Sequence, residues 1–248
     1  MRRSTGRKYM GSQDDKLNMP THERAASLAT SKASANRVKA EGATRTEGGQ
    51  QHRLSIADAQ ALVETWPEAP KKAAEKILDE YGPPNEATPT KMFWYRPGRW
   101  SRMELTADEA VHNFPTPHTD YLTQYVDYPV PAEKAAELIA FDGSVLLDRT
   151  TGELGARCDH EAYNTLTINL AAEIIAGTRT VEDARRFYAE TAAAFVMGRP
   201  APYAEGLLFD PAQPGTAADP DESVIAGAMA HQFGEKIKDA LGMGRVPQ

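Results

Sequence analysis

The sequence predicts an α+β fold in which helices pack against short antiparallel hairpins. Two segments, 91–105 and 144–158, each read as two β-strands joined by a tight turn. Segments with apolar residues at helical spacing flank both of them. Because the strands come in adjacent pairs, antiparallel pairing is favoured over a doubly wound parallel sheet.

Residues 1–53 predict a disordered basic tail. They hold 11 Lys and Arg against 5 Asp and Glu, a balance of +6, and their only larger aliphatic residues are Leu17, Leu28 and Val38. So little apolar surface cannot offset the entropy lost on ordering. A transient helix is expected only near residues 22–40. Since the whole chain carries −7, the remainder carries −13, and nucleic-acid binding is not expected because it needs clustered Lys and Arg.

A single α+β domain is predicted over residues 54–198. Ser55 followed by Asp58 is an N-cap signature and begins the first helix. A second helix is expected to start after Pro70 and to end at Gly82. The aromatic hairpin 91–105 follows, turning at a Pro-Gly pair.

Two short helices are then expected. Thr106 with Glu109 predicts a capped helix directly after the first hairpin. Pro131 begins another, because proline suits the first helical position. The residues of this second helix that are expected to face inward are Ala135, Leu138 and Ile139.

A pair of longer helices closes the predicted domain. Asp159 is expected to cap the first of them, which ends at Gly177. Thr180 with Asp183 is expected to cap the second. Both carry apolar residues at spacings of three and four, the pattern of amphipathic helices.

The chain beyond the domain reads as an extended arm and a last helix. Residues 199–220 are rich in Pro, Ala and Gly, and residues 221–248 contain the predicted C-terminal helix. The apolar residues of this helix are spaced by four and drift around its surface: Ile225, Met229, Phe233, Ile237 and Leu241. Such a stripe could pack on the body, on a protein partner or on a second copy of the chain.

Residues 112–131 hold two histidines and four prolines and show neither helical nor strand period. We interpret the stretch as a rigid connector whose aromatic rings plug the core. The alternative is a metal site, because His112, His118 and Asp120 form an H-x5-H-x-D pattern of ligand types. Three protein ligands suit a catalytic zinc, although the strong HExxH signature is absent.

Cys158 is the one cysteine, which excludes an intramolecular disulfide and any multi-cysteine zinc site. It stands before a predicted helix, whose N-terminus would lower the thiol pKa and make it nucleophilic. Its base would then be His112 or His118 rather than the adjacent His160. We favour the simpler interpretation, a small buried cysteine beside an ordinary helix cap.

The aromatic hairpin offers a binding surface through Trp94, Arg96, Arg99 and Trp100. Arginines interleaved with rings stack on bases or sugars, or clamp a carboxylate. Strand alternation places Trp94 and Arg96 on one face. We interpret the hairpin as inert on both faces and keep the contact surface as the alternative.

Dinucleotide, P-loop, serine-hydrolase and kinase motifs are all absent, so no nucleotide cofactor is expected. The leading hypothesis is a non-catalytic cytoplasmic protein that binds a protein partner or self-associates through its C-terminal helix. The alternative is a metal-dependent enzyme, such as a hydrolase, in which His112, His118 and Asp120 hold a divalent metal. No apolar run approaches the ~18 residues of a membrane span, and no apolar signal region follows the basic N-terminus.

Overall fold

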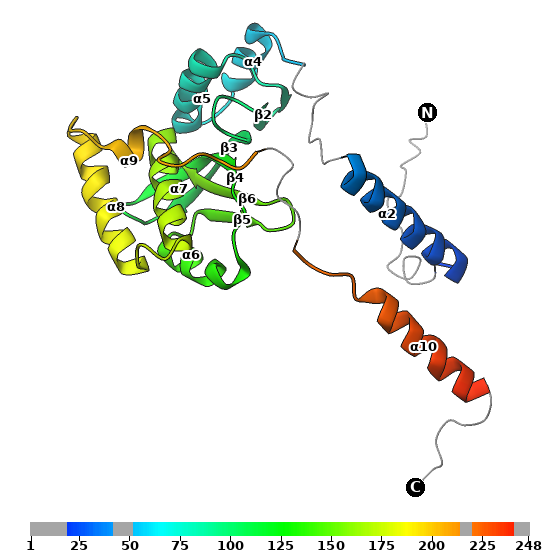
Figure 1. Cartoon of the computed structure of the whole chain (residues 1–248). Helices are drawn as coiled ribbons and strands as arrows, with labels where there is room; N and C mark the ends of the chain where they lie inside the picture. The colour runs from blue at the N-terminus through cyan, green and yellow to red at the C-terminus, as the bar shows by residue number, and fades with distance from the viewer. Residues whose placement is uncertain (1–18, 42–51, 214–219, 241–248) are drawn as a thin grey trace, which may run out of the picture. The chain divides into compact units, whose positions relative to one another are not determined.

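The computed structural model describes residues 19–41, 52–213 and 220–240, and the chain divides into two units, Met1–Arg45 and Thr46–Gln248 (Figure 1). Within the described part of the first unit, α2 (Thr21–Glu41) buries none of its residues. It covers the segment where a transient helix is expected. Most of the remaining predicted tail lies outside the described residues.

The second unit is built on one six-stranded antiparallel sheet with the strand order β1-β2-β3-β4-β6-β5. The α+β prediction and both predicted hairpins, β2–β3 and β5–β6, are confirmed. The hairpins are not separate, because a third hairpin, β3–β4, joins them into a single sheet. The strands are β1 (Glu86–Thr88), β2 (Lys91–Tyr95), β3 (Arg102–His112), β4 (His118–Asp127), β5 (Val145–Asp148) and β6 (Glu153–Cys158).

The short helix predicted from Thr106 and Glu109 is wrong, because these residues lie within β3. The hydroxyl of Thr106 does accept a hydrogen bond from a nearby backbone amide, that of Asp108, at 3.1 Å. Here the bond stabilises an irregularity of the strand, since the pairing with β4 shifts register between Leu105 and Ala110. A side chain that can cap a helix can equally satisfy the backbone of a bulge.

The connector interpretation of residues 112–131 is also wrong. His112 is the last residue of β3, and residues 118–127 form β4. The strand went unrecognised because β4 lies between β3 and β6 and is buried without a break from Asp120 to Gln124. A strand buried on both faces does not show the alternation of apolar and polar residues on which sequence reading depends.

Helices cover one face of the sheet in two groups (Figure 1). Directly paired residues point to the same face, and one such row across β2, β3, β4 and β6 is Met92, Leu105, Leu122 and Cys158. The helix α5 packs on β3 and β4, α7 packs on β4 and β6, and α6 packs on β5. The helices of the body are α4 (Ile56–Val63), α5 (Glu68–Tyr81), α6 (Ala135–Phe141), α7 (Glu161–Ile175), α8 (Val181–Val196) and α9 (Pro202–Glu205), with a 3₁₀ turn at Ala132–Lys134.

Most predicted helix ends agree with the structure. Ser55 and Thr180 cap α4 and α8 through their side chains, and Gly82 ends α5 at φ +73°, as predicted. The helix α5 begins at Glu68, earlier than predicted, with Pro70 inside its first turn. Proline is tolerated there because the first helical N–H groups have no partner within the helix.

Two details of the predicted helices are wrong. The residue that caps α7 is His160, whose Nδ1 accepts a hydrogen bond from the amide of Ala162 at 3.1 Å, and not Asp159. Ile139 of α6 is 54% exposed, whereas Leu138 is fully buried. The helix is short and rests on the sheet by a narrow edge, so only part of its predicted apolar face is covered.

The start of the predicted arm packs against the body. Asn169 of α7 donates to the carbonyls of Tyr203 and Gly206 and accepts from the amide of Leu208, all within 2.9 Å. The helix α9 therefore lies on α7. Further along the chain, the predicted C-terminal helix forms as α10 (Ile225–Ala240), while Leu241 lies outside the described residues.

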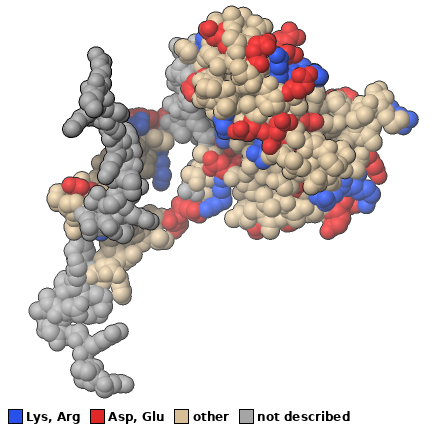
Figure 2. Space-filling model, turned by 180° about the vertical axis from the view of Figure 1, so that it is seen from behind, with Lys and Arg blue, Asp and Glu red and all other residues tan. Residues whose placement is uncertain are grey.

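Within the described ranges, none of the helices combines the length and the apolar character that crossing a membrane requires. On the face seen in Figure 2, basic and acidic side chains are interspersed over the body. This mixture differs from the continuous basic stripe of many nucleic-acid-binding domains. The absence of nucleic-acid binding stays a prediction.

Candidate metal centre

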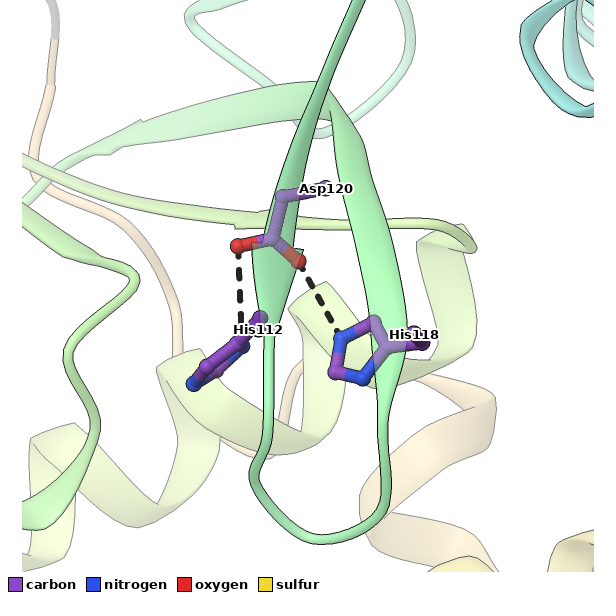
Figure 3. Close-up of side chains that lie close together, drawn as sticks. All are labelled: His112, His118 and Asp120. Carbon is purple, nitrogen blue, oxygen red and sulfur yellow. Dashed lines mark ion pairs between the residues drawn. The ribbon is translucent and has the colours of Figure 1, made fainter.

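The β3–β4 hairpin brings three metal-ligand side chains onto one face of the sheet (Figure 3). His112 and His118 are direct cross-strand partners on either side of the loop 113–117. Asp120 lies two residues after His118 on the same strand, so strand alternation turns both side chains to the same side. Residues that span nine positions of sequence therefore meet at one point.

The distances within this cluster match those between the ligands of a small metal ion. His118 Nε2 lies 3.1 Å from Asp120 Oδ1, and His112 Nδ1 lies 3.5 Å from Asp120 Oδ2. One ligand atom from each residue lies within 4.8 Å of the others. Zinc bonds of 2.0–2.1 Å in a tetrahedron place neighbouring ligand atoms about 3.3 Å apart. Two of the three separations are close to this value, so the three side chains could hold such an ion.

The outer nitrogens of both imidazoles already have partners. Nδ1 of His118 lies 2.8 Å from the carbonyl oxygen of Thr116, which can only accept, so this nitrogen carries the proton. Nε2 of His112 lies 3.5 Å from Oδ1 of Asp142, the C-cap residue of α6. With the outer nitrogens at these positions, Nε2 of His118 and Nδ1 of His112 lie on the side of Asp120. Metal-ligating histidines are characteristically oriented in this way by a carbonyl or carboxylate.

The second carboxylate is itself fixed. Oδ1 of Asp142 accepts from the amide and the hydroxyl of Ser144, and Oδ2 accepts from the hydroxyl of Thr167. The side chain is 2% exposed. Asp142 therefore has a single orientation, which sets the position of the His112 ring.

Two of the inward atoms of the cluster are left without hydrogen bonds. Nδ1 of His112 and Oδ1 of Asp120 are buried and unpartnered, as is Nε of Arg157, which lies 4.0 Å from Asp120 Oδ2. Nε2 of His118 lies 3.1 Å from Asp120 Oδ1 and 3.3 Å from the sulfur of Cys158, so a carboxylate and a thiol are its neighbours. Burial raises the pKa of Asp120, and positive charge on its neighbours opposes that shift.

Cys158 lies beside this cluster. It pairs with Leu122, two positions beyond Asp120, so its side chain points to the same face. Sγ lies 3.3 Å from His118 Nε2 and 3.4 Å from Asp159 Oδ1. Burial, and then the charge of Asp159, raises the thiol pKa well above its ordinary value. This direction is opposite to the shift expected from a helix N-terminus and favours the interpretation of Cys158 as a small buried thiol. A nucleophilic role for Cys158 stays a prediction.

The neighbouring histidine has no part in the cluster. His160 uses Nδ1 to cap α7, and its ring lies against Tyr163 and Phe195. Desolvation lowers its pKa, with Lys76 adding to the shift. It is a structural residue at the start of the helix.

The structure does not gather the four candidate residues of the aromatic hairpin into one exposed surface. Trp94 and Trp100 are buried, and their indole N–H groups donate to the Gly82 carbonyl and to Glu161. Arg96 pairs with Asp127, and Arg99 is exposed. Both rings belong to the core, which leaves no indole face for a base or sugar.

Sequence reading identified the three ligand residues but missed their surroundings. Nothing in the linear pattern connects Asp142 with His112, thirty positions earlier, so its contact with the ring could not be predicted. Comparison of the chain with protein-family models, with curated proteins and with solved structures gives no match. The chemistry of the site therefore follows from its own residues: two imidazoles and one carboxylate, the ligand number of a catalytic centre.

Proposed function

We propose that this protein is a metal-dependent enzyme whose metal is bound by His112 Nδ1, His118 Nε2 and Asp120. The observation that carries the proposal is the convergence of one ligand atom each from His112, His118 and Asp120 within 4.8 Å, while the outer ring nitrogens lie against Thr116 and Asp142. A structural network would be expected to satisfy the inner atoms as well. This interpretation replaces the preference for a non-catalytic protein.

The ligand types select the class of metal. Imidazole nitrogen suits zinc, iron, copper and nickel, whereas magnesium and calcium prefer oxygen ligands. Two histidines and one carboxylate occur in catalytic zinc sites and in non-haem iron(II) sites, and in both the protein leaves a position for water or substrate. Such an ion supplies Lewis-acid chemistry when bound. Hydrolysis remains one reaction class that this arrangement supports.

Elemental analysis of the untagged protein tests the proposal. We expect about one zinc or iron per chain, or uptake of one equivalent when the purified protein is supplied with either ion. His118→Ala and Asp120→Asn should lose that metal, and Asp120→Asn does so with almost no change in side-chain volume. His231→Ala is the matched control, because His231 is exposed on α10 and lies apart from the cluster in sequence.

The outcomes separate clearly. A chain that stays metal-free at micromolar zinc and iron would exclude the centre. Retention of full metal content by both ligand variants would assign the metal to other residues. Circular dichroism spectra of all variants show whether the loss of metal is accompanied by loss of the fold.

A second candidate function concerns α10. Ile225 and Met229 are 47% and 43% exposed and lie four positions apart, so they share one side of the helix. We keep the proposal that this helix contacts a protein partner or a second copy of the chain. If self-association is the role, light scattering should show fewer subunits per particle for a chain ending at residue 220 than for the full chain. Equal monomer masses, with no partner recovered by the full chain alone, would exclude it.

A further inference from the structure

A mostly apolar cavity of about 430 Å³ lies beside the candidate metal centre. It is bounded by the β3–β4 loop, the start of α7 and one side of α8. Residues that form its apolar walls include Pro115, Tyr163, Tyr188, Ala192, Val196 and Met197. The volume falls within the range of about 300–1,000 Å³ that is typical of small-molecule sites.

The wall formed by the β3–β4 loop is held in place without a ligand. The ring of Phe114 packs against Tyr188 at a centroid distance of 5.1 Å, and the guanidinium of Arg185 lies 3.9 Å over the Phe114 ring. Arg185 also donates to the carbonyl of Phe141 at 2.6 Å. The loop is thereby tied to α8, so a ligand would enter a preformed space and lose less entropy on binding.

The cavity adjoins the candidate metal centre through His118, the one member of the cluster that lines it. His118 and Cys158 both line the cavity, and Nε2 of His118 is the atom that faces Asp120. Cys158 Sγ, 3.3 Å from that nitrogen, adds a neutral and soft surface. An occupant of the cavity would therefore have one end within reach of the metal and its remainder among apolar side chains.

The charge of the lining limits the ligand further. Among the described residues that form the cavity, none is Lys or Arg, and the carboxylate of Asp159 stands at its edge. Phosphates need basic partners, and sugars need many polar ones. Neither requirement is met.

We propose that this cavity is the substrate pocket of the metal centre and that its substrate is a small molecule with an aliphatic or aromatic body and a single metal-binding polar end, such as a carbonyl group. This inference rests on the proposed metal-dependent function. The cavity supplies affinity through the body of the molecule, and the polar end is positioned beside His118.

Alkyl hydroxamic acids are suitable probes, because the hydroxamate binds zinc and the chain length can be varied. Calorimetric titration of the zinc-loaded protein should give binding that tightens about fourfold for each added methylene between acetohydroxamic and hexanohydroxamic acid, the value expected for full burial of a methylene. Ala193→Phe places a ring at the exposed rim of the cavity and should remove the dependence on chain length while retaining acetohydroxamate binding. Glu190→Phe, on an exposed position of α8 that does not line the cavity, should behave like the wild type.

Two results would overturn the inference. Equal affinities across the series, with zinc bound, would show that the metal centre exists but that the cavity does not take the substrate. If the affinity still depends on alkyl length in both Ala193→Phe and a second rim variant, Ala189→Phe, the alkyl chain of the probe binds outside this cavity.

Primary alcohols of four, six and eight carbons separate these failures from a failure of the metal centre, since they require no metal. Suppose that the protein binds no zinc, that longer alcohols bind more tightly, and that Ala193→Phe removes this dependence on length. The cavity would then be an apolar ligand site without a catalytic role. That result would overturn both the substrate pocket and the metal-dependent function.

Discussion

Replacement of Asp142 by asparagine tests whether the outer carboxylate orients a metal ligand. The carboxylate lies 3.5 Å from His112 Nε2 and is otherwise fully engaged with Ser144 and Thr167. Asparagine keeps the shape of the side chain, and its oxygen can retain both bonds to Ser144. Its amide can donate to the Thr167 hydroxyl. The substitution therefore removes the negative charge that faces His112 and preserves most of the surrounding hydrogen bonds.

The expected result is a loss of metal affinity without a loss of metal ligands. Substitution of such outer partners typically weakens metal binding by about 10–100-fold, or about 1.4–2.8 kcal/mol. Asp120→Asn, which removes the anionic ligand itself, should have a much larger effect. Competition with a fluorescent zinc indicator measures the zinc dissociation constants of the wild type, Asp142→Asn and Asp120→Asn. Asp108→Asn on the exposed part of β3 is the matched control and should leave the affinity unchanged.

Two outcomes would refute this reasoning. An affinity within twofold of the wild type for Asp142→Asn would mean that His112 needs no outer carboxylate. A loss as large as that of Asp120→Asn would mean that Asp142 contacts the metal directly, and the ligand set would then have to be redrawn.

Three further predictions concern stability. Chelation should lower the melting temperature of the metal-loaded wild type, because a metal at 100 times its dissociation constant adds about 2.7 kcal/mol, and it should not affect Asp120→Asn. Gly155→Ala should destabilise the fold by about 1–3 kcal/mol in urea unfolding, since its Cβ would lie 2.6 Å from the Tyr125 ring, whereas Gly143→Ala, with nothing within 4 Å, should be neutral. Asn169→Ala removes three hydrogen bonds to the segment that follows α8 and should cost about 1–3 kcal/mol, with faster limited proteolysis between residues 199 and 213. A change under 0.5 kcal/mol in the free energy of unfolding of either Gly155→Ala or Asn169→Ala would contradict the packing described.

Local signals in the sequence predicted most elements of the body. Ser55, Gly82 and Thr180 act as caps or stops, as their side chains or backbone freedom require. The predictions failed where tertiary contacts, rather than local signals, determine the secondary structure. The strand β4 shows no alternation of polar and apolar residues, because consecutive residues on both of its faces are buried. Near Thr106, the hydroxyl makes the same kind of hydrogen bond in a bulge that it would make as a helix cap.

The candidate site shows the same division between local and tertiary information. The ligand types were visible, but their meeting depends on the five-residue loop between His112 and His118, which makes the two residues cross-strand partners. The prolines of residues 112–131 instead favour a connector when only the sequence is considered. Asp142 and Cys158 come from other elements, and only the sheet order β4-β6 and the position of α6 bring them to the same place.

The distribution of unsatisfied polar atoms distinguishes this cluster from an ordinary buried network. Four buried side-chain nitrogen or oxygen atoms among the described residues have no hydrogen-bond partner, and three of them belong to His112, Asp120 and Arg157. The same fold fully satisfies Asn169 and Asp142, which are equally buried. Each unsatisfied atom costs about 1–3 kcal/mol. Three of the four unsatisfied atoms therefore gather around the Asp120 carboxylate, and the fourth is Oδ1 of Asn164. This concentration is consistent with the proposal that a cation completes the site.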